Sequence, residues 1–284
     1  MMKMKWIAQI AAVAVAAWTT VVPAPAPAEA SPELRNSKVD FAYIPPKSVK
    51  YYAMLERLKK RQFLEQLSEF VSPVRFPHPF YLITTECGVV NAFYSFSQWA
   101  IFICYEWIEE MDRIAPPPGQ PVDGITHDDV VIGETVATVL HELGHAAFDM
   151  LRIPVAGREE DAADQFMAFI ALQFSKDVAR TIVNGEAYFW YKSPNPEKWA
   201  HYADEHGTAG QRYYNTLCLA YGGDPASFKD FVDKNWLPAD RAKNCAAEFQ
   251  QIRSAFIKTV LPFIDPEMMK QVQARQWLPP QDKR

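Results

Sequence analysis

The sequence predicts an α+β fold that is predominantly α-helical. The chain has 284 residues, of which 49% are hydrophobic and 22% are charged, so it can bury a substantial core. Apolar residues recur at helical spacing along several segments that proline-containing breaks separate. One stretch, residues 81–107, is instead rich in β-branched and aromatic residues, which favours a small β-hairpin among the helices.

The first 30 residues have the pattern of a secretory signal peptide. A basic start, MMKMK, precedes an apolar stretch over residues 6–22, and Ala28-Glu29-Ala30 offers a cleavage site of the A-x-A type. The protein is therefore expected to be secreted or periplasmic, with no stable membrane insertion after cleavage. An uncleaved N-terminal anchor is the alternative, which the proline- and alanine-rich tail of this segment disfavours.

The remainder of the chain is expected to be one domain with a short polar segment before it. Residues 31–48 are polar and contain prolines, which predicts a flexible lead-in. Residues 49–284 then form a single domain, with an N-lobe of about 49–150 and a C-lobe of about 158–284. The mild net charge of −5 and the lack of a basic stripe argue against a nucleic-acid partner. The sequence does not indicate an oligomeric state.

The elements of the first lobe follow from their local patterns. Residues 49–71 carry apolar side chains at helical spacing, which predicts an amphipathic helix. The hairpin within residues 81–107 is expected to turn near Ser95–Gln98. Residues 105–115 predict a short helix, which a run of prolines ends.

Longer helices are predicted further along the chain. Thr126 and Asp129 match a capping box, so a helix is expected to start there and to run to about Leu151. After a short loop, a second helix is predicted over residues 159–174. The last long helix is predicted over about 239–264.

The four cysteines of the chain lie beyond the signal segment, and in an exported protein they are expected to pair. Three connectivities are possible. We favour Cys87–Cys104 and Cys218–Cys245 because each pair joins neighbouring elements, and the hairpin register brings Cys87 roughly opposite Cys104. Buried free thiols are the alternative. No C-x-x-C motif occurs, so a cysteine zinc site or a redox dithiol is not expected.

His141 to His145 form an H-E-x-x-H motif within the predicted helix. Residues four apart lie about 40° apart around a helix, so both imidazoles can point at one metal ion. Glu142 lies about 100° from His141 and can reach a water on that metal without ligating it. Zinc lowers the pKa of such a water, and Glu142 would act as general base. A chance match, with the histidines satisfied by ordinary hydrogen bonds, is the alternative.

A third metal ligand is expected from the acidic cluster that opens the second helix. Glu160 and Asp164 are four residues apart and share a helix face with Ala163, whose small side chain allows two helices to approach closely. Glu160 is the predicted ligand, and Asp164 is predicted to lie behind a zinc-bound histidine. Glu159 and Asp161 are expected to face solvent or the neighbouring arginine, and charge at a helix start is an alternative role for most of this cluster.

These motifs resemble those of the gluzincin zinc metallopeptidases, in which H-E-x-x-H is followed by E-x-x-x-D on a second helix. The resemblance implies a zincin-like fold with a small sheet beside the active-site helix, with zinc held by His141, His145 and Glu160. It also implies that Asp164 orients a histidine. Fourteen residues separate His145 from Glu160, fewer than in thermolysin-like members. Four stretches between Cys87 and Asp224 also resemble a bacterial "putative metallopeptidase" domain family of unknown function: CGVVNAFYSF, ICYEW, HELGHAAFDMLRIPVAGREEDAADQF and ADEHGTAGQRYYNTLCLAYGGDP.

An enzyme of this type needs a donor for the oxyanion that forms as water attacks a carbonyl. His206 is the first choice, followed by Tyr214 and Arg212, and a surface or structural polar network is the alternative role for them. Substrate can also bind as a strand added to an exposed sheet edge, for which Trp99–Cys104 is the candidate. A strand packed within the core is the alternative role for that stretch.

The sequence therefore predicts an exported zinc metallopeptidase that acts on a peptide or protein substrate. One alternative is a zinc amidohydrolase that acts on a cell-wall or other non-protein amide. Another is a non-catalytic binding protein that a metal stabilises. Glu142 argues against the last, because a structural zinc site needs no base and usually has all four positions filled by protein ligands.

Overall fold

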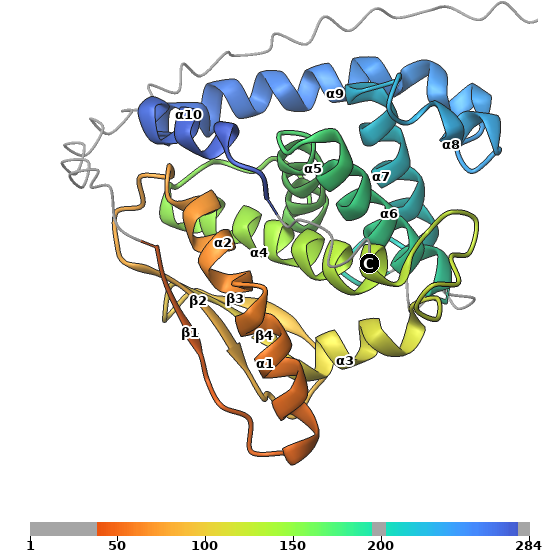
Figure 1. Cartoon of the computed structure of the whole chain (residues 1–284). Helices are drawn as coiled ribbons and strands as arrows, with labels where there is room; N and C mark the ends of the chain where they lie inside the picture. Colours follow the sequence, from red (N-terminus) through yellow and green to blue (C-terminus); the bar gives the residue numbers. More distant parts are fainter. Residues whose placement is uncertain (1–38, 195–202, 278–284) are drawn as a thin grey trace, which may run out of the picture. The chain divides into compact units, whose positions relative to one another are not determined.

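The computed structural model describes residues 39–194 and 203–277, so the predicted signal peptide lies outside the described residues. Within them, four strands form one mixed sheet of order β1-β2-β4-β3 (Figure 1). β1 pairs parallel with β2, β2 pairs parallel with β4, and β3 pairs antiparallel with β4. The strands are β1 (Val39–Tyr43), β2 (Phe80–Thr85), β3 (Ala92–Ser95) and β4 (Ala100–Cys104). The predicted α+β class is confirmed.

The hairpin turns where the sequence predicted, but its first arm is shorter than expected. β3 and β4 pair from Ser95↔Ala100 onward, and Gln98 N donates to Ser95 O at 3.2 Å. β2 is not an extension of β3: Gly88 has a φ of +79° between the two strands, and β2 turns to pair parallel with β4. As a result β4 lies between two neighbours, so the prediction that Trp99–Cys104 forms an exposed edge is wrong. The edge on that side of the sheet is β3.

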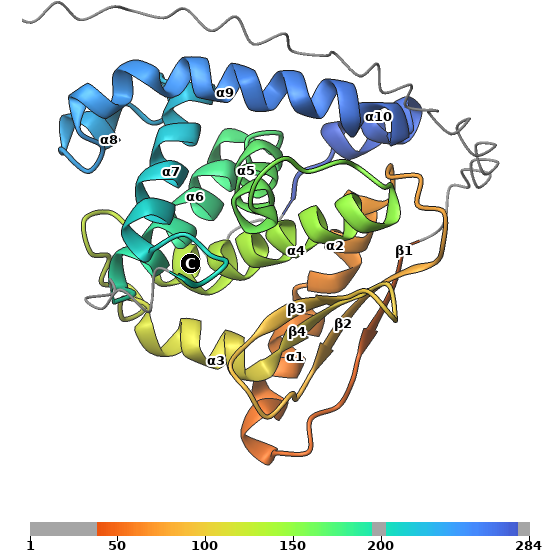
Figure 2. The ribbon, with the colours of Figure 1, turned by 180° about the vertical axis from the view of Figure 1, so that it is seen from behind.

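One face of the sheet packs against helices. Leu82, Tyr94 and Ile101 stand side by side in the register and are buried with apolar residues of α2 and α4, whereas Tyr81 and Phe93 on the other face are more than a third exposed. α1 (Tyr52–Lys60) and α2 (Phe63–Val71) lie in front of the strands in Figure 1 and behind them in Figure 2. The alternation of buried and exposed side chains is that of a sheet with one covered face.

Two expectations for the start of the chain need correction. Residues 39–43 were expected to belong to a flexible lead-in, but they form β1. The single helix predicted over residues 49–71 is two helices, α1 and α2, preceded by a 3₁₀ turn at Val49–Tyr51. The break lies at Gln62, whose φ of 51° is in the left-handed region and cannot continue a helix.

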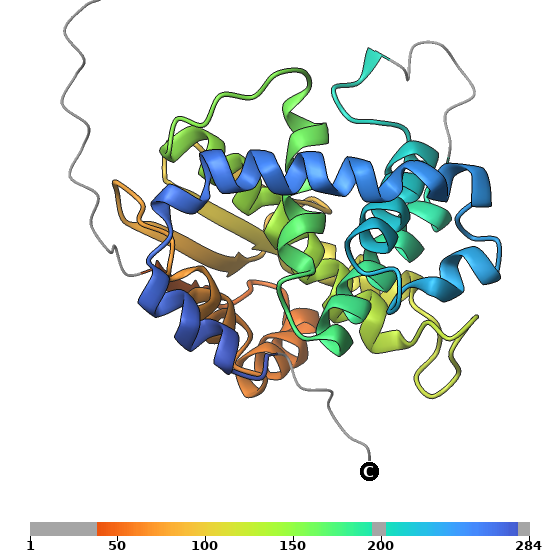
Figure 3. The same ribbon diagram turned by 90° about the horizontal axis from the view of Figure 1, so that it is seen from above.

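The remaining helices all follow β4 in the chain, and among them α3, α5 and α6 pack against α4, the helix that carries both motif histidines. They are α3 (Tyr105–Ile114), α4 (Glu134–Met150), α5 (Glu159–Ala171), α6 (Lys176–Lys192), α7 (Ala209–Gly223), α8 (Lys229–Asp233), α9 (Ala239–Thr259) and α10 (Pro266–Ala274). α9, blue in Figure 3, runs across α5 and α7. None of the helices that the structure describes is long and apolar enough to cross a membrane.

Two small residues allow α4 and α5 to approach closely. Gly144 faces Ala163, and a Cβ on Gly144 would lie only 3.1 Å from the Cα of Ala163. The predicted capping box is also present, because Thr126 N donates to Asp129 Oδ2 at 2.8 Å and Asp129 N donates to Thr126 Oγ1 at 3.1 Å. It starts a π-helical turn, Asp129–Gly133, that leads into α4. The close approach places the acidic start of α5 beside the histidines.

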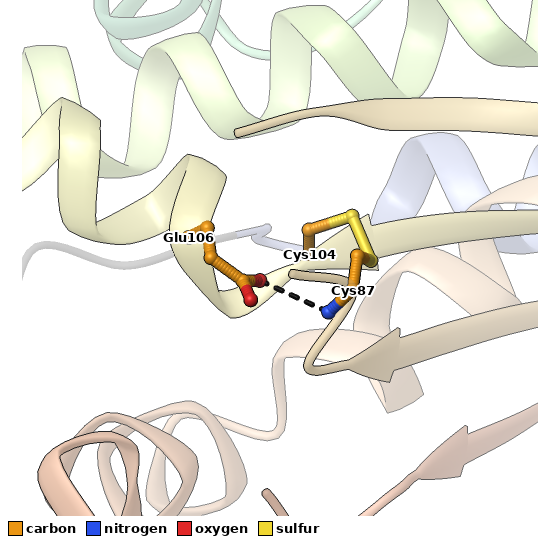
Figure 4. A group of neighbouring side chains, drawn as sticks. All are labelled: Cys87, Cys104 and Glu106. Atoms are coloured by element: carbon orange, nitrogen blue, oxygen red, sulfur yellow. Dashed lines mark hydrogen bonds between the residues drawn. A yellow bond between two sulfur atoms is a disulfide. The ribbon is translucent and has the colours of Figure 1, made fainter. Parts of the chain in front are cut away.

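Both predicted disulfides are present, Cys87–Cys104 and Cys218–Cys245. The register argument for the first was wrong, since Cys87 follows β2, and the parallel register of β2 with β4 places Thr85 opposite Cys104. Glu106 lies beside this disulfide (Figure 4), where it accepts hydrogen bonds from the backbone N–H groups of Cys87 at 3.1 Å and Gly88 at 2.7 Å. With both sulfurs bonded and the carboxylate occupied, this group is not a metal site.

The disulfide between α7 and α9 is expected to contribute substantially to stability. Cys218 and Cys245 are fully buried and 27 residues apart. Closing a loop of that length stabilises the folded state by about 3.5 kcal/mol in the chain-entropy relation. The double variant Cys218→Ala/Cys245→Ala should therefore lose about that much free energy of unfolding in urea denaturation. An unchanged denaturation midpoint would contradict this expectation.

Candidate metal centre

The two motif histidines lie side by side on the buried face of α4, and both face one carboxylate of α5. Their Nε2 atoms are 3.2 Å apart. The Nε2 of His141 lies 3.1 Å from Glu160 Oε2, and the Nε2 of His145 lies 3.4 Å from Glu160 Oε1. His141 and His145 are buried, and one ligand atom from each of the three residues lies within 4.8 Å of the other two. The structure thus brings the three predicted ligands together.

The other ring nitrogen of each histidine meets a carboxylate. His141 Nδ1 lies 2.8 Å from Asp164 Oδ1, and His145 Nδ1 lies 2.8 Å from Glu159 Oε1. An ionised carboxylate only accepts hydrogen bonds, so these contacts place the proton on Nδ1 and leave the lone pair on Nε2. Two nitrogen lone pairs and the oxygens of Glu160 then converge without a donor between them. This donor set fits a divalent metal ion with three protein ligands.

Without a cation, protons have to balance these converging groups. Burial opposes the charged form of His141, but its hydrogen bonds with Asp164 and Glu160 outweigh burial and raise its pKa to about 9. The pKa of His145 is raised in the same way, with burial again opposing the effect of the two glutamates. Burial would raise the pKa of Glu160, but its hydrogen bonds with the histidines hold it well below the usual range.

The metal-free protein is therefore expected to lose stability as the pH rises from about 6.5 to about 9. The pKa of His141 is higher in the folded state than in the unfolded state, so its contribution is complete below the lower value and is lost as the pH passes the higher one. Saturating zinc should reverse the trend, because the metal binds unprotonated histidine. Thermal melts across this pH range, with a chelator or with zinc, test this. Parallel trends in both series would contradict it.

Glu142 lies on the neighbouring face of α4 and borders a cleft. Its Oε2 accepts a hydrogen bond of 2.7 Å from the backbone N–H of Tyr94 in β3. Burial raises the pKa of Glu142, although the charges of His141 and His145 act in the opposite direction. The carboxylate is thus held by the main chain next to the converging ligand atoms, where it can exchange a proton with a group in the cleft.

The cleft has a volume of about 480 Å³ and lies between the edge strand and the metal centre. It is lined by β3, by the motif residues of α4, by the start of α5 and by the loop before α7, including Phe93, Phe96 and Glu205. The N–H of Tyr94 points to Glu142 and not to β4, so the unpaired side of β3 faces the motif residues. The cleft therefore borders both the edge of the sheet and the candidate metal centre.

His206 lines this cleft and belongs to the loop before α7. Its Nε2 lies 2.9 Å from Glu160 Oε2, and its Nδ1 lies 2.9 Å from Asp204 Oδ1. The hydrogen bond with Glu160 raises the pKa of His206 against the effect of partial burial. The His206 side chain is 41% exposed, and it is not in the group whose ligand atoms all lie within 4.8 Å of one another. His206 thus faces the candidate ligand Glu160 from the lining of the cleft.

The two other residues considered as oxyanion donors lie elsewhere. Arg212 is buried behind Asp164, with Nε 2.7 Å from Asp164 Oδ2 and Nη2 bonded to Asp164 Oδ1. Tyr214 is 42% exposed and packs against Tyr213. The described residues that line the cleft include neither Arg212 nor Tyr214.

Glu159 is a site residue that the sequence reasoning missed. It was assigned to solvent or to Arg158, but it bonds His145 Nδ1, whereas Asp161 pairs with Arg158 at 2.7 Å as expected. The available signal was the need of His145 for the same carboxylate partner that His141 finds in Asp164. Two buried carboxyl groups near the centre, Glu134 and Glu186, were also missed.

One of three comparisons with known proteins found a match. A search of curated proteins and a search of solved structures each found no match. A family model described as "Putative metallopeptidase" matches residues 43–260, a span that includes His141, Glu142, His145, Glu160 and Asp164. The match covers most of the chain, and the chain belongs to this metallopeptidase family.

Proposed function

We propose that this protein is an exported zinc metallopeptidase of the gluzincin type, with His141, His145 and Glu160 as the zinc ligands. The observation that carries the proposal is the convergence of two Nε2 lone pairs and a carboxylate in a buried place. The donor set of two histidines and one glutamate is that of catalytic zinc sites, which leave one position for water or substrate. Bound there, zinc would polarise the substrate carbonyl and acidify a water molecule.

Glu142 is the general base that accepts a proton from the attacking water. The N–H of Tyr94 holds one of its oxygens, and burial brings its pKa closer to neutrality than that of an exposed glutamate. A carboxylate in this state can take a proton from the attacking water and later donate it to the departing amine. Asp164 and Glu159 keep the two histidines in the tautomer that presents Nε2 to the metal.

The substrate binds as an extended chain along β3. This role belongs to Ala92–Ser95 rather than to β4, because β3 is the edge strand that lines the cleft. His206, steadied by Asp204, faces the ligand set from the lining of the cleft and donates a hydrogen bond to the oxyanion that forms during attack. The two disulfides are consistent with an oxidising compartment outside the cytoplasm.

The metal content and activity of the purified protein test the proposal. We expect about one zinc per chain and cleavage of casein that a chelator abolishes and added zinc restores. If the protein carries no zinc and regains none on dialysis, the metal site is disproved. If it carries zinc and cleaves peptidoglycan but not casein, the substrate is a cell-wall amide and the peptidase assignment is wrong.

A further inference from the structure

One face of α4 carries polar residues far beyond the two metal ligands. Glu134, Thr138, His141 and His145 are spaced at i, i+4, i+7 and i+11, so they form a stripe along the helix. Thr138 Oγ1 donates to Glu134 Oε1 at 3.2 Å, and Glu134 is only 1% exposed. The stripe connects the metal centre to a set of buried charges deeper in the protein.

Arg212 lies at the centre of this set. Its guanidinium forms a fork with both oxygens of Asp164, the carboxylate that holds His141 Nδ1. Its Cζ lies 3.9 Å from the ring centroid of Trp190, so the flat guanidinium rests on the indole. The indole in turn donates its Nε1–H to Glu186. Arg212 is thus held from two sides, by Asp164 of α5 and by Trp190 of α6.

Three carboxyl groups, those of Asp164, Glu134 and Glu186, surround Arg212, and the last two are buried. Glu134 and Glu186 are both buried, and burial raises the pKa of each, to which the proximity of the other carboxyl group adds in the case of Glu134. Asp164, Glu186 and Glu134 all interact favourably with the charge of Arg212. Taking the Arg212–Asp164 ion pair out of water is costly, so the pair by itself is weak evidence for a role in stability. The contacts support another role for Arg212, which is to hold the side chain of Asp164 in one orientation.

We propose that Arg212 is a positioning residue of the metal centre, which holds Asp164 so that His141 keeps its Nε2 aimed at the metal. Trp190 and Glu186 hold the guanidinium in the plane that the fork requires. Arg212 itself touches neither the cleft nor the three ligands. This inference rests on the metal site of the proposed function, but it does not depend on the protein being a peptidase.

The affinity for zinc, measured by competition with a chelator of known affinity, tests the proposal. Arg212→Met keeps the bulk of the side chain but removes the fork, and it should weaken zinc binding by roughly 10- to 100-fold. Arg212→Lys keeps the charge but not the two parallel hydrogen bonds, so it should recover only part of the loss. Arg241→Met is the matched control, because Arg241 forms a similar fork with Glu248 on α9 and should leave zinc affinity unchanged.

A double-mutant cycle shows whether Arg212 acts through Asp164. Asp164→Asn alone should weaken zinc binding, and adding Arg212→Met to it should cost little more. The proposal is overturned if Arg212→Met and Arg212→Lys both bind zinc with wild-type affinity. It is also overturned if the losses of zinc-binding free energy caused by Asp164→Asn and Arg212→Met are fully additive in the double variant. Should Arg212→Met not fold, Arg212→Lys decides alone. If the wild-type protein binds no zinc, this inference and the proposed function are both overturned. If the variants show the expected zinc affinities but the wild-type protein hydrolyses no substrate, only the peptidase assignment is overturned.

Discussion

Replacing Glu142 by glutamine is expected to lower kcat by roughly 10²- to 10⁴-fold while zinc stays bound. Glutamine has nearly the same shape, and its amide oxygen can still accept the hydrogen bond from Tyr94 N–H that holds the side chain now. It cannot take a proton from water at neutral pH. The step that Glu142 is proposed to perform would therefore be lost, while the proposed ligands His141, His145 and Glu160 stay in place.

The measurement pairs zinc content with kcat on a casein-derived peptide. Glu56→Gln serves as control, since the side chain of Glu56 is 70% exposed on α1 and far along the chain from the motif. Retention of kcat within a few-fold by Glu142→Gln would remove the general base from the mechanism. Loss of zinc along with activity would assign Glu142 to metal binding instead.

Several of the helices were predictable because their patterns are local, although the single helix expected over residues 49–71 is two helices. The apolar spacing of α3, α4 and α5 and the capping box at Thr126 and Asp129 need no knowledge of the rest of the chain. Sheet pairing is different, since a stretch of β-branched residues does not show which strand it will meet. The chain turns at Gly88, between β2 and β3, and β2 pairs parallel with β4. The stretch expected to form the first strand of one hairpin is therefore divided into two strands, β2 and β3. Cys87 still reached Cys104, through that parallel register.

The same distinction holds for the site. Glu160 and Asp164 were predictable because helical phase places both on one face of α5, towards the histidines of α4. Glu159 was not, because at the first position of α5 its side chain can turn back towards His145 in a way that phase alone does not show. The position of Arg212 depends on how α7 packs behind α5, which no local pattern encodes.

Glu160→Gln is expected to remove most of the zinc and with it the activity. Glu160 supplies the only negative charge among the three proposed ligands, and both histidine Nε2 atoms face its oxygens. Zinc binds to structural sites with four ligands with an apparent free energy of about 10–16 kcal/mol. Divided over four ligands, the loss of one should cost roughly 3 kcal/mol of binding free energy, or about 100-fold in zinc affinity. Zinc content after gel filtration and chelator competition measure the loss.

Glu159→Gln separates the role of a ligand from that of a supporting carboxylate. The two glutamates are neighbours on the first turn of α5, yet Glu159 bonds the far nitrogen of His145 and not the converging atoms. Loss of the Glu159 carboxylate should lower the affinity for zinc by roughly 10-fold, which is the low end of the range for a group that only orients a ligand. If Glu159→Gln and Glu160→Gln lower the affinity for zinc equally, Glu160 is not a direct ligand. A larger loss in Glu159→Gln would make that glutamate the ligand instead, and the metal would then lie on the other side of His145.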